Sequence, residues 1–176
     1  CKVEVSEDDL LLNEITSLVE WPVVYFGKFN KEFLSIPSVV LIAAMRGHQK
    51  YFHTVTKDKE LSNIFIAVSN IASIDPNKVK SGNQRVIHAR LSDAKFFLEN
   101  DRKTTLEARR PRLNSIMFHP ELGSLGDKTS RVKNLVLKIA SELGLNRELA
   151  SSAVELSRCD LVTEMVLEFD ELQGEI

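Results

Sequence analysis

The chain contains four apolar stripes whose members recur every three or four residues, which is the spacing of one face of an α-helix. In chain order the stripes are Leu11, Leu12, Ile15, Leu18 and Val19; Ile87, Leu91, Ala94 and Leu98; Val132, Leu135, Val136, Ile139, Ala140 and Leu143; and Leu149, Ala153 and Leu156. Asp8 and Asp9 favour the start of the first helix, and Asn146 favours the start of the last. For the third helix we expect Asp127 as the N-cap and Gly144 as the C-cap.

Shorter runs rich in β-branched and aromatic residues predict three strands in the first half of the chain. These runs are residues 23–29, 50–56 and 63–71. The polar residues 57–60 separate the last two runs, so we expect a hairpin there. A short apolar helix is expected from Pro37, because proline is well tolerated at a first helical position.

The pattern changes after Asp75-Pro76, where Ser81-Gly82-Asn83 is typical of a turn. From there we expect only helices, and the last of them either continues or kinks toward Phe169. The predicted fold class is therefore α+β. A small mixed α/β portion spans residues 1–80, and a mainly helical portion spans residues 81–176.

Composition places the chain among folded proteins, since 43% of its residues are hydrophobic and 27% are charged. No run approaches the roughly 18 to 20 apolar residues that a membrane span needs, so we expect no membrane partner. Cys1 and Cys159 lie too far apart in the sequence to suggest a disulfide framework, and a reducing, cytoplasmic location is expected. The chain begins with Cys1 rather than methionine, so we interpret it as a piece of a longer protein.

The net charge of −2 hides a marked segregation along the chain. Residues 1–20 have a balance of −5 and residues 148–176 a balance of −7, whereas residues 80–131 have a balance of +5. The tightest basic cluster is Arg109-Arg110-Pro111-Arg112. Guanidinium groups form bidentate hydrogen bonds with phosphate and stack on unpaired bases, so this basic segment is suited to binding RNA. A solvated surface with no ligand fits the same charges.

The glycine-rich segment 123–129 suggests two kinds of binding loop but fits neither. In the segment 123–129, Gly-Ser-Leu-Gly-Asp-Lys-Thr, only two residues separate the glycines where a phosphate-binding loop has four. The same Gly-x-x-Gly lies in a helical pattern rather than in a KH module. The four histidines stand singly and no Gly-x-Ser-x-Gly elbow occurs, so neither a metal centre nor a catalytic nucleophile is expected.

Read as a string, the chain closely resembles the glycyl-tRNA synthetase β-subunit family over almost its whole length. The matching stretches, in order, are Leu18-Val19-Glu20-Trp21-Pro22-Val23-Val24, His48-Gln49-Lys50-Tyr51-Phe52, Gly82-Asn83, Ala89-Arg90-Leu91-Ser92-Asp93-Ala94, Phe96-Phe97, Asp101-Arg102-Lys103, Leu122-Gly123, Asp127-Lys128, Cys159-Asp160-Leu161-Val162-Thr163, Met165-Val166, Glu168-Phe169 and Leu172-Gln173-Gly174.

The resemblance implies one part of a two-subunit ligase. In that family the α subunit holds ATP, magnesium and glycine, while the β subunit engages the tRNA for glycine and supports ATP-dependent attachment of the amino acid. We therefore expect this chain to be non-catalytic by itself and to bind tRNA and the α subunit. The candidate phosphate contacts are Arg85, Arg90, Arg102, Lys103, Arg109, Arg110, Arg112, Lys128 and Arg131.

The resemblance also implies an HD-like helical domain that lacks its metal-binding set. The histidine–aspartate pair of working HD domains is replaced here by Cys159-Asp160, and no histidine lies near residues 127–131. Two alternatives stay open at this point. One is a metal-dependent HD-type phosphohydrolase, and the other is a scaffold that contacts the partner subunit without touching RNA.

Overall fold

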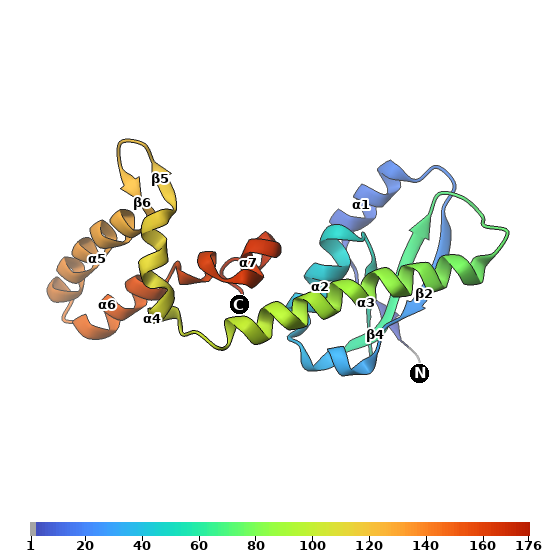
Figure 1. The fold of residues 1–176 in the computed structure, drawn as a ribbon, viewed down its shortest axis with the longest axis horizontal. Helices are drawn as coiled ribbons and strands as arrows, with labels where there is room; N and C mark the ends of the chain where they lie inside the picture. The colour runs from blue at the N-terminus through green and yellow to red at the C-terminus, as the bar shows by residue number, and fades with distance from the viewer. Residues whose placement is uncertain (1–2) are drawn as a thin grey trace. The chain divides into compact units, whose positions relative to one another are not determined.

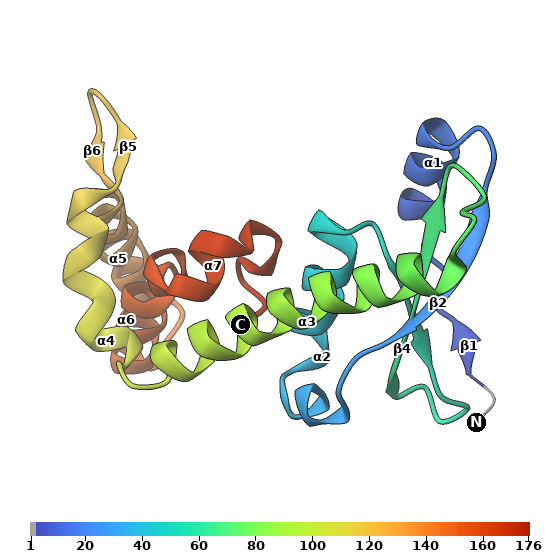
Figure 2. The same cartoon turned by 45° about the vertical axis from the view of Figure 1, so that its right-hand side comes forward.

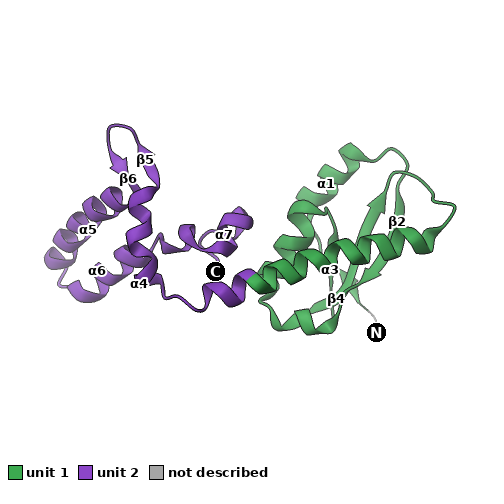
Figure 3. Ribbon diagram, in the orientation of Figure 1, with its two compact units in different colours: residues 1–96 green, residues 97–176 purple. Residues whose placement is uncertain are grey.

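The computed structural model describes residues 3–176, and Cys1 lies outside them. The chain folds as two compact units, residues 1–96 and residues 97–176, which we call unit 1 and unit 2 (Figure 3). Both α-helices and strands are present, so the expected mixed α/β composition is confirmed (Figure 1). The division into domains at residue 80 stays a proposal.

Unit 1 is built on a four-stranded antiparallel sheet with the strand order β1-β3-β4-β2 (Figure 2). The strands are β1 Glu4–Val5, β2 Val23–Lys28, β3 Phe52–Val55 and β4 Leu61–Ser69. The three predicted strands and the hairpin between β3 and β4 are confirmed, with Lys59 in the left-handed conformation of the turn. Strand β1 was not predicted from the sequence, because a strand of two exposed residues has no alternating pattern.

The helical segments of unit 1 are α1 Asp9–Leu18, η1 Lys31–Ser35, α2 Ser38–Ala43, the π-turn η2 Ala44–His48 and most of α3 Pro76–Asp101. The first helix begins as expected, since the Asp8 carboxylate accepts a hydrogen bond from the Leu11 amide at 3.0 Å. The predicted turn at Ser81-Gly82-Asn83 is wrong, because α3 runs through these residues without interruption. Helix α3 begins before this stretch, at Pro76. The Asp75 carboxylate caps it there by accepting a hydrogen bond from the Lys78 amide at 3.2 Å.

The core of unit 1 centres on Phe65 of β4, which has no exposed surface. The Tyr51 ring stacks on Phe65 with 4.7 Å between ring centroids, and the Tyr51 hydroxyl donates to Asn83 of α3 at 2.9 Å. Burial raises the pKa of Tyr51, so the phenol stays neutral and able to donate. Gly27 of β2 lies against the Phe65 ring: a Cβ atom there would come within 2.1 Å of Phe65 Cζ.

Unit 2 is mainly helical. Its elements are the end of α3, α4 Leu106–Arg109, η3 Arg110–Ser115, β5 Met117–His119, β6 Gly123–Ser124, α5 Leu125–Glu142, α6 Arg147–Leu156, η4 Cys159–Val162, α7 Glu164–Glu168 and η5 Asp170–Leu172. The expectation of helices alone is wrong, because β5 and β6 form a small antiparallel hairpin. All three residues of β5 are exposed, so no buried alternation marked it in the sequence.

The apolar stripe of the third predicted helix lies largely on the surface of unit 2. Helix α5 is confirmed, but Leu135 is 58% exposed and Leu143 is 67% exposed. The residues of α5 that unit 2 does bury are Leu125, Thr129 and Ala140, and of these only Ala140 belongs to the predicted stripe. The helix ends at Glu142 with Leu143 as its C-cap, so the predicted cap Gly144, which has a φ of +66°, lies one position beyond the observed one. Periodicity identified the helix but not its buried face.

Helix α5 begins with a capping box rather than with Asp127 as the N-cap. The Ser124 hydroxyl accepts from the Asp127 amide at 3.1 Å, and the Asp127 carboxylate accepts from the Ser124 amide at 2.8 Å. These hydrogen bonds lower the pKa of Asp127. The stabilisation that the carboxylate provides is therefore present above its unfolded pKa of about 3.9 and is lost as the pH falls through the lower folded value.

Replacing Ser124 by alanine is expected to lower the free energy of unfolding by about 1 kcal/mol, the usual cost of losing an N-cap hydroxyl. Urea denaturation monitored by circular dichroism measures this change. Ser130→Ala is the matched control, because that exposed hydroxyl donates to the Gly126 carbonyl of the same helix. Equal stability of S124A and S130A would contradict the capping role of Ser124.

Candidate nucleic-acid interface

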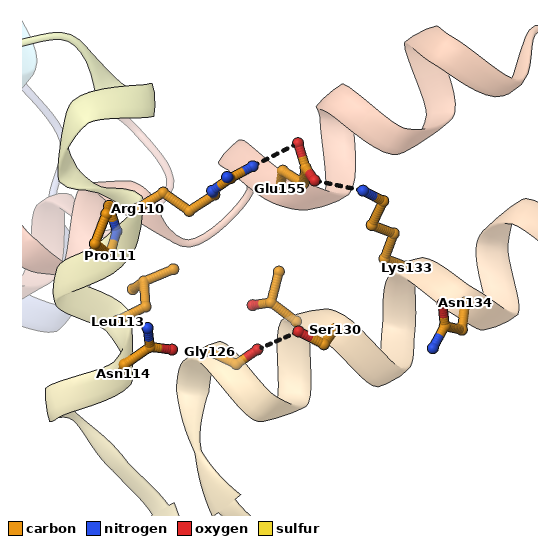
Figure 4. Close-up of a pocket in the computed structure, with 10 residues that line it drawn as sticks. Arg110, Pro111, Leu113, Asn114, Gly126, Ser130, Lys133, Asn134 and Glu155 are labelled. Atoms are coloured by element: carbon orange, nitrogen blue, oxygen red, sulfur yellow. Dashed lines mark hydrogen bonds and ion pairs between the residues drawn. The ribbon is translucent and has the colours of Figure 1, made fainter.

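A polar cavity of about 450 Å³ opens in unit 2 between η3, the first half of α5 and the end of α6. Figure 4 shows Arg110 of η3, Lys133 of α5 and Glu155 of α6 pointing toward one another at one side of it. Pro111 and Leu113 add apolar surface, and Asn114, Ser130 and Asn134 add groups that donate or accept hydrogen bonds. The cavity therefore combines positive charge with hydrogen-bonding and apolar surface.

One carboxylate holds both cations at the cavity. Glu155 forms an ion pair with Arg110 at 2.8 Å and with Lys133 at 2.5 Å. The hydrogen bond from Lys133 is the largest cause that lowers the pKa of Glu155, and the nearby Arg110 lowers it further. The three groups leave one net positive charge at the cavity, which suits an anionic ligand.

The wall formed by η3 and α5 depends on a glycine. A Cβ atom at Gly126 would lie 1.8 Å from the Asn114 side-chain oxygen, so only glycine lets the two segments approach this closely. The Ser130 hydroxyl donates to the Gly126 carbonyl at 3.0 Å, as the dashed line in Figure 4 marks. The Thr129 hydroxyl lines the same cavity, is buried, and has no hydrogen-bond partner among the described residues.

Among the nine predicted phosphate contacts, Arg109 has a structural role. It is only 5% exposed, and its guanidinium forms an ion pair with the Asp101 carboxylate at 2.9 Å. It also donates to the carbonyls of Asp101 at 3.1 Å and Val162 at 3.4 Å. A guanidinium held in this way has no surface left for a phosphate, so we leave Arg109 out of the proposed interface.

The other eight predicted residues are divided between the two units. Arg85 and Arg90 lie on the part of α3 that belongs to unit 1. Within unit 2 the remaining six are at least partly exposed: Arg102, Lys103, Arg110, Arg112, Lys128 and Arg131. Lys128 lies over the Phe118 ring, 3.8 Å from its centroid, and Lys103 donates to the Asn100 side chain at 2.8 Å. Of these six, only Arg110 lines the cavity.

Lys133 was not among the predicted phosphate contacts, and the fold brings it to Arg110 through Glu155. The basic segment of the sequence ends at residue 131, and Glu155 lies in the acidic segment 148–176. The sequence nonetheless contains a pattern that could have identified Lys133. Ser130, Lys133 and Asn134 are polar residues at the spacing of one helix face, next to the apolar stripe of α5.

The replaced histidine–aspartate pair has structural contacts. Cys159 has no exposed surface, and its thiol donates to the Glu155 carbonyl at 3.4 Å. Burial raises the pKa of Cys159, so the thiol is protonated and a poor nucleophile. The Asp160 carboxylate accepts from the Gly174 amide at 2.9 Å. Within residues 3–176 no group of three or more histidine, cysteine, aspartate or glutamate side chains is placed to hold a metal ion.

The glycine-rich segment 123–129 does not fit the phosphates of ATP. Gly123 has a φ of +81° and begins β6 of the hairpin, while Asp127 closes the capping box of α5. The Lys128 ammonium is engaged by the Phe118 ring.

None of the described helices is both long enough and apolar enough to span a bilayer.

Comparison with known proteins identifies the family. The model of the glycyl-tRNA synthetase beta subunit matches residues 1–176. The glycine–tRNA ligase beta subunit of Chromohalobacter salexigens is 49% identical over 167 residues, which is 95% of this chain and 24% of that protein. Those of Pseudoalteromonas translucida and Neisseria meningitidis are 49% and 45% identical, each over 97% of this chain and 25% of the relative. The chain spans about a quarter of the length of these relatives, and it belongs to the glycyl-tRNA synthetase beta subunit family.

Proposed function

We propose that this chain forms part of the tRNA-binding surface of a glycine–tRNA ligase, where it positions the tRNA for glycine while an α subunit attaches the amino acid. Family membership supports the ligase, and the cavity of unit 2 with its two cations supports RNA contact. ATP and magnesium are expected at the α subunit, as the resemblance to this family implies. The assembly is expected in the cytoplasm.

The proposed phosphate contacts in unit 2 are Arg102, Lys103, Arg110, Arg112, Lys128 and Arg131, with Lys133 added from the structure. Arg85 and Arg90 remain proposed contacts in unit 1. The observation that carries the proposal is the pair Arg110 and Arg112 on η3. The Arg110 side chain is 51% exposed, and the exposed Arg112 forms no ion pair within residues 3–176. Exposed arginines held on a short rigid segment are available to a phosphate backbone.

Charge removal at η3 tests this proposal. The double variant Arg110→Gln and Arg112→Gln is expected to weaken tRNA binding about tenfold or more, and to reduce the slope of log affinity against log salt by about two, because each lost phosphate contact releases one counterion fewer. Fluorescence anisotropy with labelled tRNA at several salt concentrations measures both quantities. The control is Lys57→Gln with Lys59→Gln, which removes the same charge from the β3–β4 turn of unit 1. Identical affinities and slopes for the two variants would contradict the proposal.

One observation favours a second role for unit 2, which is contact with another protein surface. Leu135, Ile139 and Leu143 form an exposed apolar stripe along α5. Such a stripe is typical of a surface that packs against a partner. If this is the main role of unit 2, tRNA binding will respond weakly to salt and the arginine variants will bind as tightly as the wild type.

We further propose that unit 2 keeps the helical frame of an HD domain without its chemistry. The position of the histidine–aspartate pair is occupied by Cys159 and Asp160, and both are engaged by backbone groups. No observation favours the phosphohydrolase alternative. The Cys159 thiol has no exposed surface and donates to the Glu155 carbonyl, so it is not presented to a metal ion.

A further inference from the structure

The cavity at Glu155 continues into a groove along α5. A second hollow of about 410 Å³ shares Lys133 and Glu155 with the cavity, and a third of about 560 Å³ shares Asn134 with it. Leu137 and Arg147 line both the second and the third hollow. The three hollows therefore follow one side of α5, and we call them together the α5 groove.

The α5 groove is long, is lined by both polar and apolar side chains, and carries basic side chains at two places. At one end Arg110 and Lys133 meet at Glu155. At the other end Lys138 of α5 and Arg147 of α6 lie among the acidic Glu142 and Glu148, and the Arg147 guanidinium donates to the Ser141 hydroxyl and, at 3.5 Å, to the Leu137 carbonyl. From Ser130 to Ser141 the helix rises about 16 Å at 1.5 Å per residue. The groove is therefore longer than a single nucleotide.

These features favour a single strand of RNA over a duplex. A single strand presents one row of phosphates, which matches two cationic points along one groove, and it exposes base edges and faces that a duplex hides. In the cavity, Pro111 and Leu113 offer apolar surface to a base, while Asn114 and Asn134 offer amide groups to its edge. A duplex is contacted along two rows of phosphates, and the cavity walls would keep its paired bases out.

We propose that the α5 groove binds an unpaired stretch of RNA, with one phosphate bound between Arg110 and Lys133 in place of the Glu155 carboxylate. This inference rests on the proposed tRNA-binding function and deepens it. Glu155 keeps the two cations in position while the groove is empty, so the ordered guanidinium and ammonium groups lose little conformational freedom when a phosphate arrives. The carboxylate also competes with the phosphate, which makes its removal informative.

The test uses a labelled single-stranded RNA of eight nucleotides, the same sequence as a duplex, and AMP. Lys133→Gln is expected to weaken binding of the single strand about tenfold, as the loss of a charge-assisted hydrogen bond would. Glu155→Gln is expected to strengthen it severalfold, because the competing charge is gone while the side-chain shape remains. Duplex RNA and AMP are expected to bind at least tenfold more weakly than the single strand.

The response of Glu155→Gln separates binding from a merely structural role. If Glu155 only links η3, α5 and α6, its substitution will leave affinity unchanged or lower it, and the inference is overturned. AMP binding as tight as the strand, or a preference for the duplex, would overturn it as well. Lys57→Gln is the control, since that exposed lysine of the β3–β4 turn does not line the groove and is not a proposed phosphate contact. If intact tRNA binds with salt dependence but K133Q and E155Q behave as wild type, only the groove inference fails. If tRNA does not bind at all, the proposed function fails.

Discussion

Replacing Arg109 by methionine is expected to lower the free energy of unfolding by about 3 kcal/mol or more, the usual cost of removing one partner of a buried ion pair. The side chains of Arg109 and Asp101 are only 6% and 12% exposed. The substitution leaves the Asp101 carboxylate without its cation and the Val162 carbonyl without its donor. Water is largely excluded from these atoms, so it would not compensate for the loss.

The loss of stability should extend to α7, because the Asp101 carboxylate also holds the start of that helix. Its carboxylate accepts from the Glu164 amide at 3.0 Å and the Met165 amide at 2.8 Å, which orders the start of α7. Chemical denaturation of R109M, D101N and the double variant would give the coupling energy of the pair. The neighbouring Arg112→Met is the control, expected to change stability by no more than about 0.5 kcal/mol because Arg112 is exposed. If R109M were as stable as R112M, the structural role of Arg109 would be ruled out.

Replacing Gly27 by alanine is expected to cost about 1 to 3 kcal/mol, the range for overpacking a filled core. The new methyl group would lie 2.1 Å from Phe65 Cζ. The Phe65 ring cannot move aside easily, because it is fully buried and stacked on Tyr51. Either the ring or the edge strand β2 must shift, and both changes disturb the sheet of unit 1.

Thermal denaturation of G27A measures this cost, and a second substitution identifies its cause. Phe65→Leu shortens the side chain that the methyl group meets, so the double variant should lose less stability than the two single losses combined. Gly82→Ala is the matched control. A Cβ atom there meets nothing within 4 Å, and alanine is expected to stabilise α3 by about 0.5 to 1 kcal/mol. A G27A variant as stable as G82A would show that β2 accommodates the methyl group.

The sequence predicted local structure best where the signal lies within a few residues. Asp8 and Asn146 cap α1 and α6 as expected, because an N-cap side chain bonds to amides two or three residues away. Ser81-Gly82-Asn83 misled the prediction for the same reason. Turn preference is a local property, whereas this stretch is held in α3 by the Asp75 cap and by the hydrogen bond from Tyr51 to Asn83, which lies 32 residues away.

At the candidate site, residues that are neighbours in the sequence have different surroundings in the structure. Arg109, Arg110 and Arg112 are almost adjacent and chemically identical in the sequence. In the structure the first is buried against Asp101, the second meets Glu155 at the cavity, and the third is exposed. Successive residues of a helical turn point in different directions, so their surroundings depend on elements that lie tens of residues away.

The sequence by itself determined the family, the elements with strong periodicity and the basic middle of the chain, because residue identity, spacing and formal charge are properties of the string. Only the tertiary structure decided which face of α5 is buried and which arginine is buried. It also decided that Lys133 and Arg110 pair with the same carboxylate, that of Glu155. Burial and ion pairing depend on distances in space. Those distances are set by how η3, α5 and α6 pack together, and no single stretch of sequence contains that information.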